Sequence, residues 1–347
     1  MKIGLVGFPG SGKTTVFNAL TGLAADTSPG ARPGRANLGV VKVPDDRLDR
    51  FADLYSPKKT TYAEISFCDI AGGNSTRGLD REVLTSMREM EALCQVLRGF
   101  ANPALPDPAH PRQELQDLLA ELLLADLDIV ERRTVRLQKE RGDPQDLALL
   151  LRAKDHLEAE QPLRTLETNE AERRSLRGYH LLSSKPLLLV LNVDEDDVAE
   201  PVPEALMADA GGAGLGIVVL SARVEMDIAQ MAPEEQAEFY AALGLGESAQ
   251  TRFIQGAFDL LDLITMFTVG PDECRAWSIR RGSTAPRAAG KIHSDIERGF
   301  IRAEVIHWRD HVELGSESKC REAGKLRVEG RDYIVQDGDD VHFRFNV

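Results

Sequence analysis

The sequence predicts an α/β protein with a mainly parallel sheet, an inserted antiparallel helical arm and a small β-rich domain at its C-terminus. Three observations lead to this fold class. Buried strand patterns alternate with amphipathic helix patterns up to residue 98, which is typical of a parallel sheet whose strands are joined by helices. A run of leucines at helical spacing interrupts the alternation within residues 112–180. Short strand patterns dominate from residue 264 onward.

Length and composition are those of a globular chain with about two or three domains. The chain has 347 residues, of which 42% are hydrophobic and 28% are charged, and its formal net charge is −14. No apolar run approaches the ~20 residues of a membrane span, and the N-terminal apolar stretch lacks a signal-peptide cleavage site. The four cysteines form no CxxC pair, which favours reduced thiols. We therefore expect a cytoplasmic protein with no membrane contact.

The first part of the chain carries the strand and helix alternation. Strands are predicted, in chain order, at residues 2–6, 38–43 and 63–69 and within the segment ALCQVLRGF. Helices are predicted between them, at residues 14–23, at residues 45–54 and in the first part of residues 79–98. The stretch from 25 to 39 is rich in Gly, Pro and Ala and predicts an irregular loop.

Residues 112–180 predict an antiparallel helical arm. Leucine and valine side chains recur at helical spacing through its first helix. Asp143 followed by Pro144 is a favourable N-terminal cap and opens a second helix. Asn169, with Glu172 three residues later, matches a capping box for a third helix.

After the arm the alternation resumes and then gives way to a β-rich region. Strands are predicted at residues 186–192 and 216–221, and helices at residues 234–243 and 249–263. The strands predicted beyond residue 264 are ITMFTVG, RAWSI, GFIRAEVIHW, DYIVQ and VHFRFNV. One helix is predicted among them, near residues 287–296.

One segment of this region is locally basic although the whole chain is acidic. Between Arg275 and Arg302 there are seven basic residues and two acidic ones. Trp277 and Phe300 within the segment are candidates for stacking on nucleic-acid bases. Their alternating sequence context favours core positions in a small β-domain instead.

A glycine-rich loop directly follows the first strand. Residues 7–14 read GFPGSGKT and fit the pattern GxxxxGK[ST] in the strand, loop and helix context that the motif requires. Glycines let backbone N–H groups converge on an anion, and the helix N-terminus adds a partial positive charge. We expect Lys13 to reach the β- and γ-phosphates of a nucleotide and the Thr14 hydroxyl to ligate Mg²⁺. The predicted phosphate-binding residues are Gly7, Pro9, Gly10, Ser11, Gly12, Lys13, Thr14 and Thr15.

A second motif, DIAG at residues 69–72, ends a predicted strand. A carboxylate at this place approaches the metal bound to the nucleotide. The alternative interpretation is an aspartate that caps a turn. The predicted metal ligands are Thr14 and Asp69, and the predicted catalytic residues are Lys13, Thr14, Asp69 and Gly72. Gly73 stands where Ras-type enzymes carry the glutamine that orients the attacking water, so we expect a low basal hydrolysis rate that a partner raises.

A third motif, NVDE at residues 192–195, lies at the C-terminal end of a buried strand, where ligands of doubly wound sheets bind. Conventional GTPases carry Asn-Lys-x-Asp here, and the Asp carboxylate accepts two hydrogen bonds from guanine. Val193 replaces that lysine and Glu195 replaces that aspartate, which predicts a reduced preference for guanine. A fourth element, Ser-Ala after the next strand, matches a short base-contacting loop. The predicted base-binding residues are Asn192, Val193, Glu195, Ser221 and Ala222.

With these four elements in order, the chain resembles the YchF-type Obg-like ATPases, a translation-factor-class branch of P-loop proteins that prefer ATP to GTP. The similarity covers nearly the whole chain. It is strongest at residues 267–306 and 322–347, which look like the TGS domain of the family. NVDE matches the family's adenine-associated NxxE motif at Asn192 and Glu195.

The resemblance implies a domain layout and a function. The implied domains are a P-loop G domain at 1–111 and 181–263, a helical coiled-coil insertion at 112–180, and a TGS domain of ubiquitin-like β-grasp shape at 264–347. The implied function is hydrolysis of ATP with Mg²⁺ as cofactor. The implied partner is the ribosome or its RNA, contacted through the TGS domain and the helical arm.

Two other functions remain open at this point. The chain could be a conventional GTP-binding GTPase, which a comparison of ATP and GTP binding would decide. It could also be a nucleotide-dependent binding module with little hydrolysis, in which the nucleotide only changes how the arm and the TGS domain contact RNA or ribosomal protein. Binding to RNA phosphates would have to weaken with salt.

Overall fold

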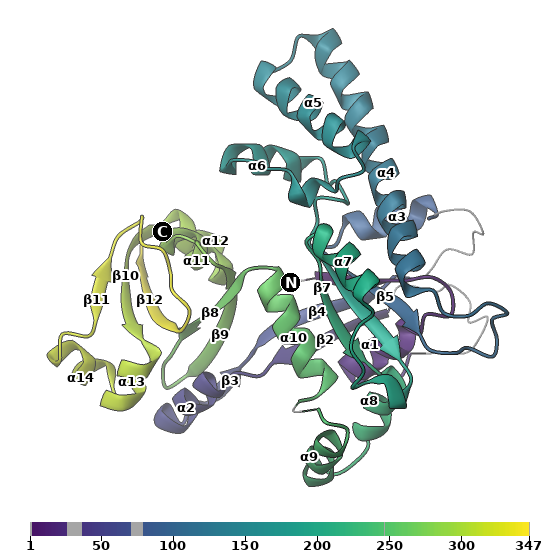
Figure 1. Ribbon diagram of the computed structural model, residues 1–347. Coiled ribbons are helices and arrows are strands. Elements are labelled where there is room, and N and C mark those ends of the chain that lie inside the picture. The colour runs from purple at the N-terminus through teal and green to yellow at the C-terminus, as the bar shows by residue number, and fades with distance from the viewer. Residues whose placement is uncertain (1, 26–36, 71–78, 246, 347) are drawn as a thin grey trace. The chain divides into compact units, whose positions relative to one another are not determined.

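The structure is a computed structural model that describes residues 2–25, 37–70, 79–245 and 247–346 (Figure 1). Its contacts divide the chain into two compact units. The first comprises Met1–Val40 and Ser66–Leu260, and the second comprises Val41–Ile65 and Leu261–Val347. Residues 41–65 lie within the predicted nucleotide-binding domain, but contact clustering groups them with residues 261–347, although the ends of β2 and β4 in this range belong to the first sheet.

The first unit is built on a six-stranded sheet with the order β2-β4-β1-β5-β6-β7. The strands are β1 (Lys2–Val6), β2 (Asn37–Val43), β4 (Ala63–Asp69), β5 (Ala92–Gly99), β6 (Leu187–Val193) and β7 (Gly216–Leu220). β1 pairs in parallel with β4 and β5, and β5, β6 and β7 continue the parallel pairing. The predicted mainly parallel sheet is confirmed, and the carboxyl ends of β1, β4, β5, β6 and β7 lie along one edge.

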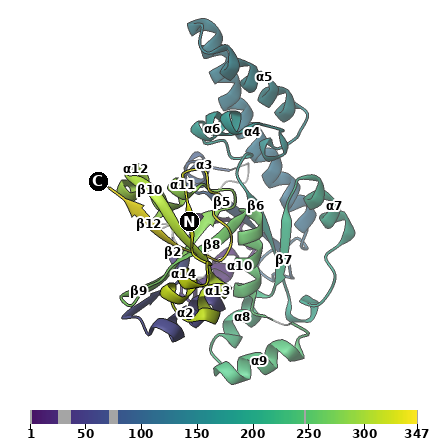
Figure 2. The ribbon, with the colours of Figure 1, turned by 90° about the vertical axis from the view of Figure 1, so that its left-hand side faces the viewer.

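Helices cover both faces of this sheet (Figures 1 and 2). One face packs against α3 (Arg81–Arg88), α4 (Pro111–Glu140) and α7 (Glu204–Gly212). The other face packs against α1 (Lys13–Thr21), α8 (Ala222–Ile228) and α10 (Ala249–Leu260). Between α8 and α10 the chain forms α9 (Pro233–Ala242). Because both faces are covered, nearly every residue of β5 and β6 is buried, with no alternation between buried and exposed positions.

The predicted arm consists of α4, α5 (Pro144–Glu158), a short turn of 3₁₀ helix (Leu163–Thr165) and α6 (Glu170–Gly178). Both predicted caps are present. The Asp143 carboxylate accepts from the N–H of Gln145 at 2.9 Å. Asn169 and Glu172 accept from each other's backbone N–H groups at 2.9 and 3.0 Å, which is a complete capping box.

α4 belongs to two apolar cores. Leu115, Leu118 and Leu122 in its first half pack into the core under the sheet. Val130 in its second half packs with α5 and α6. Asp126 lies between the two parts, is fully buried, and accepts from the N–H groups of Leu182 and Ser183 at 2.8 and 2.6 Å.

The second unit contains a mixed six-stranded sheet with the order β11-β10-β12-β8-β9-β3. Its strands are β3 (Lys59–Thr61), β8 (Leu263–Thr268), β9 (Glu273–Arg280), β10 (Phe300–His307), β11 (Arg327–Glu329) and β12 (Asp339–Phe345). Four of the five predicted C-terminal strands are confirmed. The fifth, DYIVQ, is wrong, because that segment makes only an isolated bridge between Ile334 and Thr284.

The helices of the second unit are more numerous than the sequence predicted. Beyond residue 264 the structure has α11 (Ala285–Ile292), α12 (Ser294–Arg298), α13 (Trp308–Leu314) and α14 (Glu317–Glu322) where one helix was expected. Three of these have seven residues or fewer, so they are too short to show a full apolar period. α11 packs on the sheet through small side chains, including those of Ala285, Ala288 and Ala289.

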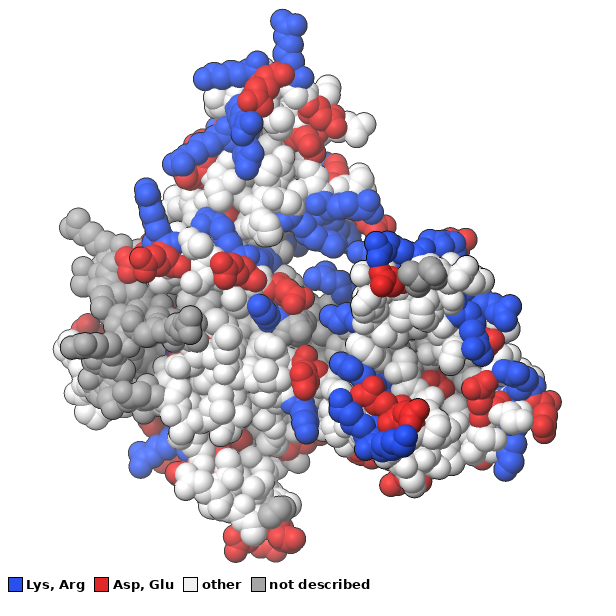
Figure 3. Space-filling model, turned by 180° about the vertical axis from the view of Figure 1, so that it is seen from behind, with Lys and Arg blue, Asp and Glu red and all other residues white. Residues whose placement is uncertain are grey.

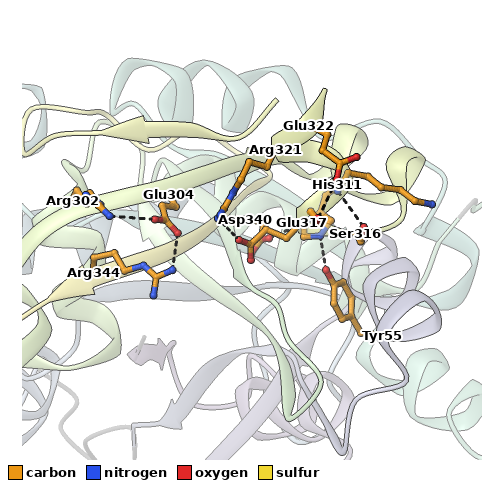
Figure 4. A network of polar contacts seen from close by, with 12 residues as sticks. Tyr55, Arg302, Glu304, His311, Ser316, Glu317, Arg321, Glu322, Asp340 and Arg344 are labelled. Atoms are coloured by element: carbon orange, nitrogen blue, oxygen red, sulfur yellow. Dashed lines mark hydrogen bonds and ion pairs between the residues drawn. The ribbon is translucent and has the colours of Figure 1, made fainter. Parts of the chain in front are cut away.

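Residues 41–65 join the second unit through α2 (Asp46–Tyr55) and β3. β3 pairs in parallel with β9, and the ring of Phe51 packs on that of Phe267. Figure 4 shows the polar part of this attachment. The Tyr55 hydroxyl lies 2.6 Å from Nε2 of His311, whose Nδ1 lies 2.8 Å from the buried Asp340 carboxylate.

Among the described residues, none of the helices combines the length and the apolar character that a membrane span requires.

Candidate nucleotide-binding site

The glycine-rich loop between β1 and α1 has the backbone shape that its glycines allow. Gly10 and Gly12 both have φ of +81°, in the left-handed region. A Cβ at Gly12 would overlap with the side-chain amide of Asn192, and a Cβ at Gly10 would lie 2.6 Å from a Leu105 methyl group. Both positions therefore require glycine for conformation and for space.

Polar groups of the loop are left available for an anion. The first N–H groups of any α-helix have no intrahelical acceptor. In α1 no side chain of the cap residue Gly12 replaces that acceptor. The Ser11 side chain is buried, and its hydroxyl has no hydrogen-bond partner in the described part of the chain. Buried donors of this kind at a helix N-terminus favour a phosphate group.

Lys13, Thr14 and Asp69 converge from two adjacent elements, as predicted. Lys13 and Thr14 open α1, and Asp69 ends β4, which pairs directly with β1. The Lys13 ammonium forms an ion pair with one oxygen of the Asp69 carboxylate. The Thr14 hydroxyl donates to the other oxygen at 3.0 Å.

Two further asparagines hold this arrangement, and the sequence analysis missed both. Asn37, at the start of β2, donates to the Asp69 carboxylate at 3.3 Å. Asn102 donates to the carbonyl oxygen of Gly10 at 3.3 Å. Neither asparagine belongs to a phosphate-binding motif, so only the fold reveals that Asn37 reaches Asp69 and that Asn102 reaches the loop.

Asn192 connects the loop with the predicted base-binding segment. Its Nδ2 donates to the carbonyl oxygen of Ser11 at 3.1 Å, and its Oδ1 accepts from the N–H of Ala222 at 3.0 Å. Ser221, next to Ala222, follows β7 as the N-terminal cap residue of α8 and is buried. Three of the predicted elements therefore meet at the carboxyl edge of the sheet, where doubly wound proteins bind ligands.

The remaining predicted residues differ in their surroundings. The Val193 side chain is buried in the core, so only its backbone can face a ligand. Glu195 opens a short 3₁₀ helix (Glu195–Asp197) and is exposed. Gly7 and Thr15 are partly buried, Pro9 is exposed, and Gly72 lies outside the described residues.

The oxygen atoms at the site fit a hard divalent cation that is shared with phosphate groups. Mg²⁺ is commonly held by one or two protein oxygens together with substrate phosphates and water. The Thr14 hydroxyl and the Asp69 carboxylate supply two such oxygens side by side. Among the described residues no cluster of three or more His, Cys, Asp or Glu side chains forms a separate metal site.

Family profiles match both ends of the chain. The profile described as 50S ribosome-binding GTPase matches residues 2–133. The profile named YchF-GTPase_C, described as a protein of unknown function, matches residues 263–346.

Full-length relatives share the whole architecture. The protein called ribosome-binding ATPase YchF from Bacillus subtilis (strain 168) is 39% identical over 365 residues, with 100% of each chain covered. The protein of the same name from Escherichia coli O157:H7 is 41% identical over 361 residues, with 100% of this chain and 99% of the relative covered.

Solved structures agree. The Schizosaccharomyces pombe YchF GTPase superposes with a TM-score of 0.84 at 30% identity, covering 99% of this chain and 97% of that one. A GTP binding protein from Pyrococcus horikoshii OT3 has a TM-score of 0.65 at 20% identity over the full length of both chains, which shows the shared fold.

Proposed function

Since this chain belongs to the YchF family, we propose that it is a ribosome-associated P-loop ATPase that hydrolyses ATP to ADP and phosphate. The observation that carries the proposal is the convergence of Lys13, Thr14, Asp69 and Asn192 at one edge of the sheet. The relatives from Bacillus subtilis and Escherichia coli are named ribosome-binding ATPases, and they match the chain over its full length. Association with ribosomes also supports a cytoplasmic location.

In this proposal the loop and the first turn of α1 bind the triphosphate. Backbone N–H groups from Gly10 to Thr15 donate to phosphate oxygens, and Lys13 exchanges its ion pair with Asp69 for the β- and γ-phosphates. Thr14 and Asp69 would hold Mg²⁺, which would neutralise charge that develops on the phosphates. Asn192 keeps the loop in register with the base-binding segment.

Preference for adenine follows from the third motif. The segment has Val193 and Glu195 where guanine-specific proteins have lysine and aspartate, so the fixed carboxylate that accepts from guanine is replaced by a longer and exposed side chain. A conventional GTPase is the competing function, and the family profile described as a GTPase favours it. Isothermal titration of the full chain with ATP and with GTP, in Mg²⁺, tests the two. Tighter binding of GTP would reverse the assignment.

We propose ribosome contact through the TGS domain at residues 264–347 and the arm at residues 112–180. Basic side chains gather at the end of the arm on the face in Figure 3. The basic residues in the last two turns of α4 are Arg136 and Lys139. In the second unit the Arg275 guanidinium lies 4.0 Å from the centre of the Trp277 ring, which is partly buried. Phe300 is only 5% exposed, so it is a core residue rather than a stacking group.

Co-sedimentation with purified ribosomes tests this contact. We expect binding that falls with salt and that weakens when Lys139 and Arg136 at the end of the arm are replaced by glutamine. Phosphate release measured with and without ribosomes tests the low basal rate. A high rate that ribosomes leave unchanged would contradict the proposed switch function and favour a constitutive ATPase. Binding without any hydrolysis would favour the nucleotide-dependent binding module.

A further inference from the structure

A cavity of about 340 Å³ lies between α3 and α4, in the first unit. α3 supplies Arg81, Leu84, Thr85 and Arg88, and α4 supplies Ala125, Asp128, Ile129 and Arg132. The volume is at the lower end of the ~300–1,000 Å³ that is usual for ligand pockets. The residues named above as the nucleotide-binding site do not line this cavity.

The lining combines an aliphatic surface with arginine side chains. Leu84, Ala125 and Ile129 are the aliphatic members, and Leu84 and Ala125 also pack on the core under the sheet. Arg81, Arg88 and Arg132 are the basic members, and Asp128 is the single acidic one. The lining therefore carries a formal charge of about +2, although the chain as a whole is strongly acidic.

One donor atom of Arg88 lacks an acceptor, while the charge of its guanidinium group acts on the buried Asp126 carboxylate and partly offsets the rise in the pKa of that group. The Arg88 Nε atom is buried and has no hydrogen-bond partner in the described part of the chain. A buried donor without an acceptor is unfavourable, so a ligand oxygen that pairs with this guanidinium group is stabilised. Arg132 is already paired with Asp128 at 2.7 Å, and the Thr85 hydroxyl donates to the Arg81 carbonyl oxygen. The lining thus offers guanidinium donors and no spare acceptor except Asp128.

We propose that this cavity binds an acidic peptide segment of a partner protein, with a carboxylate on the arginines and an aliphatic side chain on Leu84 and Ile129. Planar guanidinium groups pair with carboxylates through two parallel hydrogen bonds. The aliphatic surface gives an apolar side chain of the same peptide a place to be buried.

A nucleic-acid strand fits this cavity less well. Single strands bind through aromatic side chains on which bases stack, and among the described residues no aromatic side chain lines the cavity. A peptide can also donate a backbone N–H to the Asp128 carboxylate, whereas a phosphate has no donor for it.

The place of the cavity suggests what the peptide does. α3 begins at Arg81, shortly after the DIAG motif at residues 69–72 that approaches the nucleotide phosphates in the proposed function. A peptide held by Arg81 and Arg88 contacts the first and the last residue of this helix, so we expect its binding to change the rate of ATP hydrolysis. This effect on hydrolysis rests on the proposed function, but binding of the peptide does not.

Binding is tested on the full chain without nucleotide, by fluorescence anisotropy. The probe is a fluorescein-labelled peptide of alternating glutamate and leucine. Matched probes replace every glutamate by glutamine, or the whole peptide by an oligouridylate of equal charge. The protein variants are Arg88→Gln and the exposed Arg81→Gln, with Arg136→Gln as the control, because Arg136 is an exposed arginine of α4 that lies outside the lining.

We expect the glutamate peptide to bind and each of the two lining variants to weaken it by about tenfold, while Arg136→Gln changes the affinity less than twofold. The glutamine peptide should bind at least tenfold more weakly. No binding of the glutamate peptide, equal loss in Arg136→Gln, or tighter binding of the oligouridylate that depends on Arg81 would each overturn the proposal. ATP affinity measured on the same variants stays at the unmodified value if only the cavity is affected, which separates this outcome from a failure of the proposed function.

Discussion

Asn192 donates a hydrogen bond from its side-chain nitrogen to the carbonyl oxygen of Ser11, at 3.1 Å. The donor is buried at the end of β6, and the acceptor belongs to the phosphate-binding loop. One side chain therefore sets the distance between the loop and the strand that carries the base-binding motif.

Replacing Asn192 by Leu should weaken ATP binding by about 10- to 100-fold, because the buried Ser11 carbonyl and the Ala222 N–H each lose a partner worth about 1 kcal/mol or more. Isothermal titration with Mg²⁺ and ATP measures the change. Asn102→Ala is the matched control, since Asn102 also donates to this loop, but at 3.3 Å and from an exposed position. Equal losses in the two variants would show that the buried bridge has no special role.

Replacing Lys13 by Ala should weaken binding of ATP with Mg²⁺ by at least about 100-fold. The variant removes the charge that is aimed at the phosphates and leaves Asp69 without its ion-pair partner, so that a carboxylate only 5% exposed faces an anionic ligand. Lys2→Ala, on an exposed residue at the start of β1, serves as control. Unchanged affinity of the Lys13 variant in the same titration would remove the basis of the proposed function.

Gly12→Ala and Gly22→Ala form a matched pair at the two ends of α1. Both glycines have positive φ, but an added Cβ meets the Asn192 amide at Gly12 and meets nothing within 4 Å at Gly22. Gly22→Ala should cost about 1–2 kcal/mol of unfolding free energy from backbone strain alone. Gly12→Ala should cost more than that and should also weaken ATP binding. Urea denaturation monitored by circular dichroism compares them, and equal costs would contradict the overlap.

Asp126→Ala should destabilise the first unit by about 3–5 kcal/mol, because it leaves the buried N–H groups of Leu182 and Ser183 without an acceptor. The control is Asp128→Ala, two residues further along α4, at a side chain that is 55% exposed. It should change the unfolding free energy by less than about 1 kcal/mol. Thermal denaturation of both variants gives the comparison. A small effect of Asp126→Ala would mean that water replaces the carboxylate.

Tyr55 makes stability depend on pH in the alkaline range. Burial, followed by the nearby Asp340 carboxylate, raises the pKa of Tyr55 from 10.0 to about 12. A raised pKa in the folded state contributes stability that is complete below pH 10 and is lost as the pH rises through 12. The unfolding free energy of Tyr55→Phe should therefore fall less between pH 10 and pH 12 than that of the unmodified protein, by on the order of 1 kcal/mol after solvent screening. Identical pH profiles in urea titrations would exclude this contribution.

Local patterns in the sequence were sufficient to predict most helices and strands of the first unit. The strand, loop and helix around Lys13 and the caps at Asp143 and Asn169 depend on residues within a few positions of one another, so the sequence determines them directly. The convergence of Asp69 and Asn192 on the loop was predictable because the carboxyl ends of parallel strands meet at one edge of a sheet.

Features that depend on contacts distant in sequence were not predictable in the same way. The amphipathic pattern of α2 indicates that Phe51 is buried. It does not indicate that the Phe51 ring packs on Phe267, in the C-terminal part of the chain, rather than on a residue of the first sheet. Asn37 and Asn102 lie in segments with no recognisable motif and reach the site only through strand order. The segment DYIVQ has the alternating pattern of a strand. The ring of Tyr333 in it packs on the core, and the Tyr333 hydroxyl donates to the Asp339 carboxylate. Within the described residues, the segment forms no continuous strand pairing with a neighbour.

The continuity of α4 has a mechanical consequence. Its 30 residues form one helix, about 45 Å long. The first half of this helix packs into the core under the sheet, and the second half packs against α5 and α6. A rigid rod held in this way amplifies rotation, so a tilt of about 5° at the clamped end moves the far end by about 4 Å. Sub-ångström repacking around Leu115 and Leu118 is therefore enough to reposition whatever the far end touches.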